Sequence, residues 1–345
     1  MTLDLPLIWA GVIAVAVLMY VLLDGFDLGV GMLFPFATPK ERDVMMDSVA
    51  PVWDGNETWL VLGGGGLFAA FPLAYATLMP ALYIPILLML MGLILRGVAF
   101  EFRLRGRRRG KAFWTAAFAG GSLIATVAQG LVLGGFIQGV AVRDGEFVGG
   151  PLDWLTPYSL LVAIGLIAGY VLLGAAWLVW RTEGELQTKS HRWTALAAAA
   201  TAFLLGAASL ATLFVHGRIA ERWGFNYINA DGLSLQVERL APLLPIPLLG
   251  LLGLALVATG LRRRRDARPF VGAFMVFLSG YLGLAVGFFP HIVPYDLTFR
   301  QAANADNALG LMLVGVALLL PVILGYTVWV YWLFRGKVSA DAGYH

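Results

Sequence analysis

Pro-Val-Trp-Asp-Gly-Asn-Glu-Thr-Trp-Leu-Val-Leu-Gly-Gly-Gly-Gly is the sequence of residues 51–66. It opens an apolar run that predicts a membrane helix, yet it carries the carboxylates Asp54 and Glu57 between two tryptophans. A carboxylate at the centre of a membrane helix costs roughly 2.5–3.5 kcal/mol on insertion scales. Another acidic pair, Asp24 and Asp27, lies inside the preceding apolar run. These two acidic groups indicate an ion or proton path.

The composition places this segment in a membrane protein. The chain has 345 residues, of which 59% are hydrophobic and 13% are charged, whereas soluble proteins carry about 25% charged residues. It contains no cysteine, which excludes disulfides, a thiolate haem ligand and a cysteine metal site. The basic residues lie in short loops, so the sequence predicts no nucleic-acid partner.

Hydropathy predicts an all-α polytopic protein with about nine transmembrane helices. About 20 apolar residues cross a bilayer, and the chain contains nine such runs. The predicted spans are 7–34, 52–72, 74–100, 112–140, 156–180, 193–215, 240–260, 269–290 and 307–334.

The loops between these spans divide into a basic and a less basic set. One alternate set, residues 35–50, 101–111, 181–192, 261–268 and 335–345, holds 18 of the 24 Lys and Arg residues, and the other set holds five. Basic loops remain in the cytoplasm. The asymmetry therefore predicts an N-terminus outside the cytoplasm, a C-terminus inside, and odd-numbered spans that run inward.

In this orientation, six ionisable residues of the first three spans lie toward the cytoplasmic side. They are the candidate proton path: Asp24, Asp27, Asp54, Glu57, Arg96 and Glu101. Asp24 and Asp27 share a helix face because they are three residues apart. Gly25 and Gly29 lie on roughly the opposite face, and their spacing permits close approach of another helix.

Each candidate also has a purely structural interpretation. Asp54 and Glu57 have the spacing of a capping box at a helix start. Arg96 could neutralise a carboxylate, or extend its guanidinium to the inner surface. The glycines at 63–66 favour close packing or local distortion, and Gln129 favours hydrogen bonding between helices.

The histidines give weak evidence for a cofactor. His191 and His345 fall in inner loops or the tail, while His216 and His291 fall at outer helix ends. No second histidine lies one helical turn from any of them. The sequence therefore predicts no haem and no metal in this chain.

Several motifs resemble subunit II of cytochrome bd-type quinol oxidases. They are Asp24-Gly-Phe-Asp-Leu-Gly-Val-Gly-Met32, Pro51-Val-Trp-Asp-Gly-Asn-Glu-Thr-Trp59, Leu67-Phe-Ala-Ala-Phe-Pro72 and Arg96-Gly-Val-Ala-Phe-Glu-Phe-Arg103. The closing Tyr331-Trp-Leu-Phe-Arg-Gly-Lys337 and residues 343–345 are similar to the cyanide-insensitive branch. The resemblance covers nearly the whole chain and is strongest over residues 20–103.

The resemblance implies a complex that oxidises quinol and reduces dioxygen to water in the bacterial cytoplasmic membrane. Subunit I would carry two b-type haems, one d-type haem and the quinol site, and a small accessory subunit could join. Subunit II would have two four-helix bundles, here residues 1–140 and 156–290, and a last helix over 307–334. Asp54, Asp24 and Arg96 match a polar route from the cytoplasm, and Trp59 matches a tryptophan at a dioxygen entrance.

Two other classes of function fit parts of the pattern. Carboxylates inside a polytopic protein are also typical of proton-coupled transporters, although a transporter favours helix breaks near the midplane. A non-catalytic assembly subunit could use the same polar groups only to fix helix register.

Overall fold

The computed structural model describes residues 3–105, 108–226 and 234–338. The similarity noted at residues 343–345 lies outside these described residues. Helices make up most of the fold: α1 (Leu5–Leu33), α2 (Pro39–Val49), α3 (Trp53–Ala70), α4 (Pro72–Ala81), α5 (Tyr83–Arg105), α6 (Arg108–Gln138), α7 (Pro157–Arg181), α8 (Gly184–Val215), α9 (Gly217–Arg222), α10 (Val237–Leu240), α11 (Pro245–Arg262), α12 (Ala267–Phe288), α13 (Phe299–Ala302) and α14 (Asp306–Leu333), with 3₁₀ turns at Phe34–Phe36 and Ala241–Leu243.

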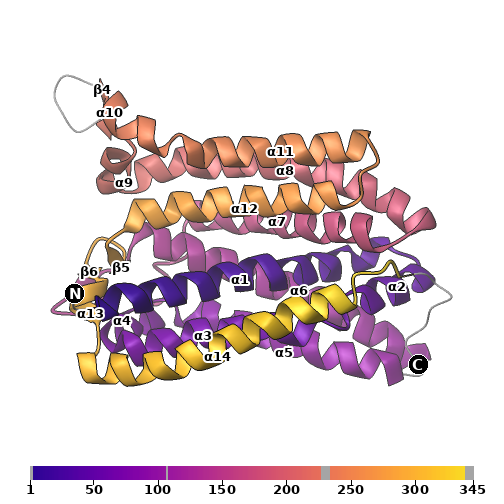
Figure 1. Ribbon diagram of the computed structural model, residues 1–345, viewed down its shortest axis with the longest axis horizontal. Coiled ribbons are helices and arrows are strands. Elements are labelled where there is room, and N and C mark those ends of the chain that lie inside the picture. The colour runs from indigo at the N-terminus through magenta and orange to yellow at the C-terminus, as the bar shows by residue number, and fades with distance from the viewer. Residues whose placement is uncertain (1–2, 106–107, 227–233, 339–345) are drawn as a thin grey trace.

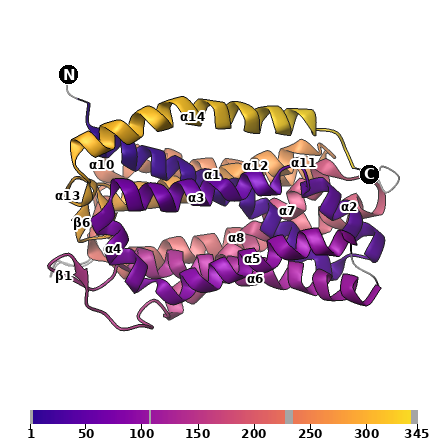
Figure 2. The ribbon, with the colours of Figure 1, turned by 90° about the horizontal axis from the view of Figure 1, so that it is seen from below.

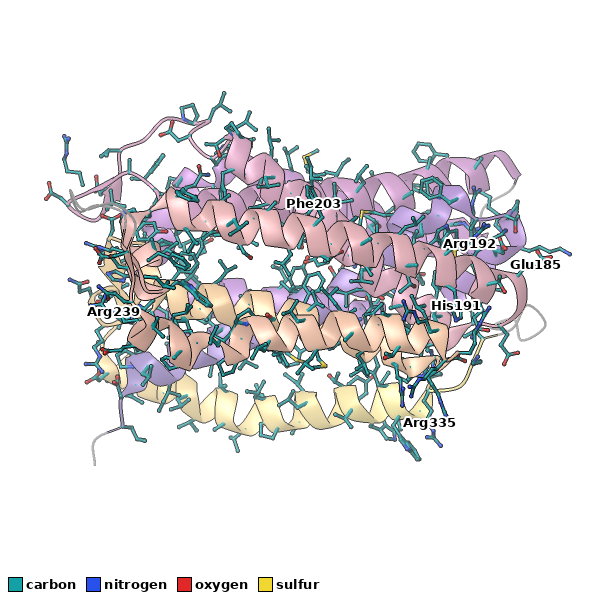
Figure 3. All side chains as sticks on the ribbon, turned by 90° about the horizontal axis from the view of Figure 1, so that it is seen from above. Glu185, His191, Arg192, Phe203, Arg239 and Arg335 are labelled. Carbon is teal, nitrogen blue, oxygen red and sulfur yellow. The ribbon has the colours of Figure 1, made fainter. Side chains whose placement is uncertain are left out.

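The long helices lie side by side along one axis, and their connections gather at the two ends (Figure 1). Figure 3 shows Arg192 and Arg335 at one end and Arg239 at the opposite end. We call the first the basic end, because it also carries the run Arg262 to Arg265 after α11. The predicted all-α membrane fold is confirmed, since eight described helices are long and apolar enough to span a membrane, or nine if α3 and α4 form one broken span.

The boundary between the second and third predicted spans is wrong. The predicted span 74–100 is divided between α4 and α5, and α4 is bent by 119° relative to α3. Phe71 has φ −132° and ψ 62° because the ring of Pro72 disfavours helical backbone in the residue before it. The chain therefore turns at Phe71, and the next long helix, α5, begins at Tyr83. Figure 2 shows α4 between α3 and α5.

The predicted inner loop 35–50 contains helix α2. Its start is a capping box, in which Thr38 Oγ1 accepts from Glu41 N and Glu41 Oε2 accepts from Thr38 N. Pro39 occupies the first helical position, where its missing N–H has no cost. This Thr-Pro-x-Glu signal was available in the sequence and was missed.

Short antiparallel hairpins lie at the end opposite the basic end (Figure 1). They pair β1 (Val142–Arg143) with β2 (Glu146–Phe147), β3 (Phe225–Asn226) with β4 (Ser234–Leu235), and β5 (His291–Val293) with β6 (Leu297–Thr298). Their strand pairing gives hydrogen-bond partners to backbone N–H and C=O groups in loops, which no helix supplies.

Glycines allow α1 and α7 to pack backbone to backbone. A methyl group built on Gly29 would lie 1.8 Å from the Tyr170 carbonyl oxygen, and one built on Gly174 would lie 2.4 Å from Val30 N. Gly25 likewise faces the Tyr170 ring, so the close-approach prediction is confirmed. In the 63–66 run, Gly63 and Gly66 face α1 side chains, whereas Gly64 and Gly65 face open space.

Helix α7 packs against α1, α6, α8 and α12. It therefore joins the two predicted bundles, and the division at 1–140, 156–290 and 307–334 stays a prediction. Helix α14 lies along the outside of the helix bundle (Figure 2), and much of its apolar surface is exposed. Trp9 Nε1 donates to Leu309 O at its first turns, and Arg181 donates to Phe334 O beyond its last.

Candidate functional site

A buried group of ionisable side chains lies where α1, α3 and α5 meet. We call Asp24, Asp27, Asn56, Glu57 and Arg96 the acid–arginine cluster. Asp24 is 0%, Asn56 1%, and Asp27 and Arg96 2% exposed, whereas Glu57 is 28% exposed. All five lie in the half of the fold toward the basic end, because α1 and α5 end there and α3 begins there.

Arg96 is the cation of this cluster. Its Nη2 atom lies 2.7 Å from Asp24 Oδ1 and also pairs with Glu57 Oε1. The alternative in which Arg96 extends to the surface is wrong, since its side chain is almost fully buried. A guanidinium cannot be deprotonated in a protein, so at this depth it needs both carboxylates. The two ion pairs join α5 to α1 and α3.

Asp27 belongs to the cluster but has a different partner. Its Oδ2 atom accepts from Asn56 Nδ2 at 2.7 Å. Asn56 Oδ1 in turn accepts from the hydroxyl of Tyr331 at 2.9 Å. Sequence reasoning missed both residues, although Asn56 lies within the quoted motif and Tyr331 opens the closing one.

A second hydrogen-bonded group lies on the same face of α1, one turn before Asp24. Gln129 Nε2 donates to the Tyr20 hydroxyl at 2.8 Å, and the Tyr170 hydroxyl donates to Gln129 Oε1 at 2.8 Å. Gln129 therefore joins α6 to α1 and α7, as predicted. The Tyr20 hydroxyl accepts the bond from Gln129 and keeps its own hydrogen.

Two of the predicted path residues lie outside the cluster. Asp54 and Glu101 are exposed, and neither makes a hydrogen bond or an ion pair with a residue that the structure describes. The capping-box interpretation of Asp54 is wrong: α3 begins at Trp53, and its N-cap is Val52, without a side-chain cap. Asp54 therefore stands free in the first turn of α3, where the helix dipole favours a negative charge.

Trp59 lies deeper along α3 and is 2% exposed. Its Nε1 donor has no hydrogen-bond partner among the described residues, although buried indole N–H groups usually have one. Four atoms of the acid–arginine cluster are likewise buried without a hydrogen-bond partner among the described residues: Asp24 Oδ2, Asp27 Oδ1, and Nε and Nη1 of Arg96. These atoms are the donors and acceptors that remain for water or for a transferred proton.

Helix α2 covers the basic end with acidic residues. Asp43 Oδ1 lies 2.8 Å from Arg103 Nη2, and Lys189 Nζ lies 2.7 Å from Glu41 Oε1. Burial alone would raise the pKa of Glu41, but the hydrogen bonds from Lys189 and Thr38 lower it. Burial and the nearby Asp43 raise the pKa of Asp47.

The three described histidines each engage the ring Nδ1 atom in a hydrogen bond. The His216 ring stacks on Tyr295 with centroids 3.7 Å apart, and its Nδ1 accepts from Arg218 N. His191 Nδ1 is bonded to Gln187 O, and His291 Nδ1 lies 3.3 Å from Phe288 O. His191 lies within α8, His216 caps the C-terminus of the same helix, and His291 lies in β5. No group of three or more metal-ligating side chains occurs in the described ranges.

The geometry defines a class: an all-helical membrane protein with carboxylates and an arginine buried near one membrane surface. The family described as cytochrome bd terminal oxidase subunit II matches residues 5–334. The chain belongs to this family.

Two characterised relatives extend the match over nearly the full length. Cytochrome bd-I ubiquinol oxidase subunit 2 of Escherichia coli strain K12 is 29% identical over 363 residues, covering 98% of this chain and 96% of the relative. Cytochrome bd ubiquinol oxidase subunit 2 of Bacillus subtilis strain 168 is 29% identical over 344 residues, covering 96% of each. A chain in the solved structure of bd oxidase from Geobacillus thermodenitrificans has the same fold, with a TM-score of 0.73 and 15% sequence identity. The match covers 97% of this chain and 100% of that one.

Proposed function

We propose that this chain is the haem-free subunit II of a quinol:dioxygen oxidoreductase, and that the acid–arginine cluster lies on a proton route to the site of dioxygen reduction. The observation that carries the proposal is the ion-paired set Asp24–Arg96–Glu57, buried within membrane-spanning helices. Two relatives are named as ubiquinol oxidase subunits, and these names support quinol as the substrate of the complex.

The partner would be the haem-bearing subunit I, with quinone, membrane lipid and a small accessory subunit as further partners. Exposed apolar surface on α14 and α3, including Val61 and Leu311 at 72% and 77% exposed, suits contact with lipid or a partner chain. Two b-type haems and one d-type haem would lie in subunit I, where they would carry electrons from quinol to dioxygen.

The chain's own residues would take up and hold protons. Asp54 and Glu101, both exposed near the basic end, would take protons from the cytoplasm. Glu57, one turn of α3 from Asp54, would pass them toward Asp24, because both contact Arg96. Arg96 would stabilise the carboxylates while they are ionised. Trp59 would line the dioxygen entrance.

Such a route has an energetic consequence. Reducing dioxygen to water consumes protons, and oxidising quinol releases them. If uptake is from the cytoplasm and release is outside, the reaction separates charge across the membrane without a pump. A polar route through an apolar subunit serves this uptake.

Replacing Asp54 by asparagine tests the route. Asparagine keeps the shape and cannot exchange a proton, and Asp54 is not a cap whose loss would unfold α3. We expect normal haem content in the complex and quinol oxidase turnover lower by about tenfold, equal to ~1.4 kcal/mol on the barrier. Asp54→Glu should recover part of the turnover.

Asp306→Asn is the matched control, because Asp306 is an exposed carboxylate in the first turn of α14 at the opposite end. It should leave turnover unchanged. Wild-type turnover of Asp54→Asn in a fully assembled complex would remove Asp54 from the route.

The orientation can be tested separately. From the basic asymmetry of the loops, we expect reporters fused after residues 108, 148, 265 and 345 to report inside, outside, inside and inside. A pair of enzymes active on opposite sides of the membrane gives this measurement. A cytoplasmic signal at 148 would reverse the orientation and place the acid–arginine cluster on the wrong side for uptake from the cytoplasm.

A further inference from the structure

The acid–arginine cluster contains more carboxylates than cations. Asp24 and Glu57 both contact Arg96, so this part already holds two acids for one guanidinium. Asp27 is 2% exposed, and no Lys, Arg or His of the described chain forms an ion pair with it. An ionised carboxylate buried without a cation is among the costliest groups in a membrane helix.

The hydrogen bonds around Asp27 distinguish its two oxygen atoms. Oδ2 accepts from Asn56 Nδ2, and Oδ1 is buried without a hydrogen-bond partner among the described residues. The donor from Asn56 makes Oδ2 the carbonyl oxygen, and Oδ1 is left to carry a hydrogen. The arrangement therefore fits a neutral carboxylic acid.

Leu23 and Tyr331 hold Asn56 from either end of its amide. An amide can be turned end for end, but Asn56 Nδ2 lies 3.4 Å from the Leu23 carbonyl oxygen, which can only accept, and this contact selects the orientation in which Nδ2 faces Asp27. In that orientation the Tyr331 hydroxyl donates to Asn56 Oδ1. The Tyr331 ring lies edge-on to Phe26 and Trp177, with centroids 6.5 and 6.2 Å away. Helix α14 thus reaches the cluster through Tyr331.

We propose that Asp27 holds a proton in the resting protein, and that Asn56 and Tyr331 are positioning residues that set how readily it is released. The inference rests on the proposed proton route. The charged and titratable groups around Asp27 are Asp24 on α1, Glu57 on α3, Arg96 on α5 and Tyr331 on α14. The step is a proton transfer alone: the Oδ1–H bond of Asp27 breaks, and the proton passes to water or to a neighbouring carboxylate.

The sign of the Tyr331 effect follows from hydrogen-bond cooperativity. A hydroxyl that donates to the amide oxygen makes the amide N–H a stronger donor, which stabilises the ionised form of Asp27. Without the hydroxyl, the ionised form is less stable. Tyr331→Phe should therefore make Asp27 keep its proton to a higher pH.

The test is infrared spectroscopy of the assembled complex as a function of pH. The wild-type complex should show the carbonyl band of a protonated carboxylic acid that disappears in Asp27→Asn. In Tyr331→Phe, this band should shift and should titrate at higher pH, while turnover falls about fivefold, the size expected from loss of one hydrogen bond. Tyr326→Phe, on the exposed side of α14 at 61% exposure, should change neither.

Two results would overturn the inference. The first is a complete set of carboxylic acid bands in Asp27→Asn, and the second is a Tyr331→Phe band identical to wild type in position and titration. If Asp27→Asn does not assemble, ¹³C labelling of the wild-type aspartate carboxyls identifies the band as that of an aspartate, and its shift in Tyr331→Phe assigns it to Asp27, which Tyr331 reaches through Asn56. A normal turnover of Asp54→Asn would remove Asp54 from the route and leave this band in place, so the two proposals fail separately.

Discussion

Arg96→Leu is expected to prevent accumulation of the assembled oxidase. The substitution leaves Asp24 buried at 0% exposure without its cation, and removing one partner of a buried ion pair costs about 3–5 kcal/mol. Total stabilities of proteins are only about 5–15 kcal/mol. The amount of haem-containing complex purified from membranes measures the effect.

Two further variants show whether charge is the cause. Arg96→Lys keeps the charge but replaces a planar fork with a single ammonium group, so it should retain part of the complex. Adding Asp24→Leu to Arg96→Leu removes the stranded carboxylate and should also restore part of the yield. An Arg96→Leu complex with wild-type yield would contradict the assigned ion pairs.

Gly29→Ala is expected to separate α1 from α7. Its new methyl group would lie 1.8 Å from the Tyr170 carbonyl oxygen and 2.9 Å from Gly174 N. These are backbone atoms and cannot move without shifting a whole helix. Overpacking usually costs about 1–3 kcal/mol, and this contact should reach or exceed the upper value. The thermal midpoint and yield of the complex report the loss.

Gly11→Ala is the control on the same helix, because nothing lies within 4 Å of the new methyl group. It should be neutral, or stabilise the helix by up to about 1 kcal/mol through its better propensity. Equal behaviour of Gly29→Ala and Gly11→Ala would show that the close crossing does not form.

The elements that sequence reasoning identified correctly depend on local composition. A long apolar run identifies α1 or α12 wherever it packs, because the bilayer supplies the same surroundings to each helix. The errors lie where backbone chemistry competes with hydropathy. Residues 72–95 carry no charged residue, but Pro72 redirects the chain at Phe71 and makes α4 a separate helix.

The candidate site shows the same division. The cost of a charge in a membrane marks Asp24, Asp27 and Arg96 as functional candidates from the sequence alone. Sequence spacing does not decide between a cap and a free carboxylate at Asp54, because the Asp-x-x-Glu pattern is the same in both. The start of α3 at Trp53 decides it, since that start places Asp54 inside the first turn.

The sequence by itself determined that this chain crosses a membrane many times, which family its motifs resemble, and that Asp24, Asp27 and Arg96 lie within apolar spans. Only the tertiary structure decided which partners they have. Arg96 pairs with residues 72 and 39 positions away, and Tyr331 reaches Asn56 across 275 positions. The physical reason is that burial follows from the composition of one helix, whereas a hydrogen bond or an ion pair requires the rotation and crossing of at least two.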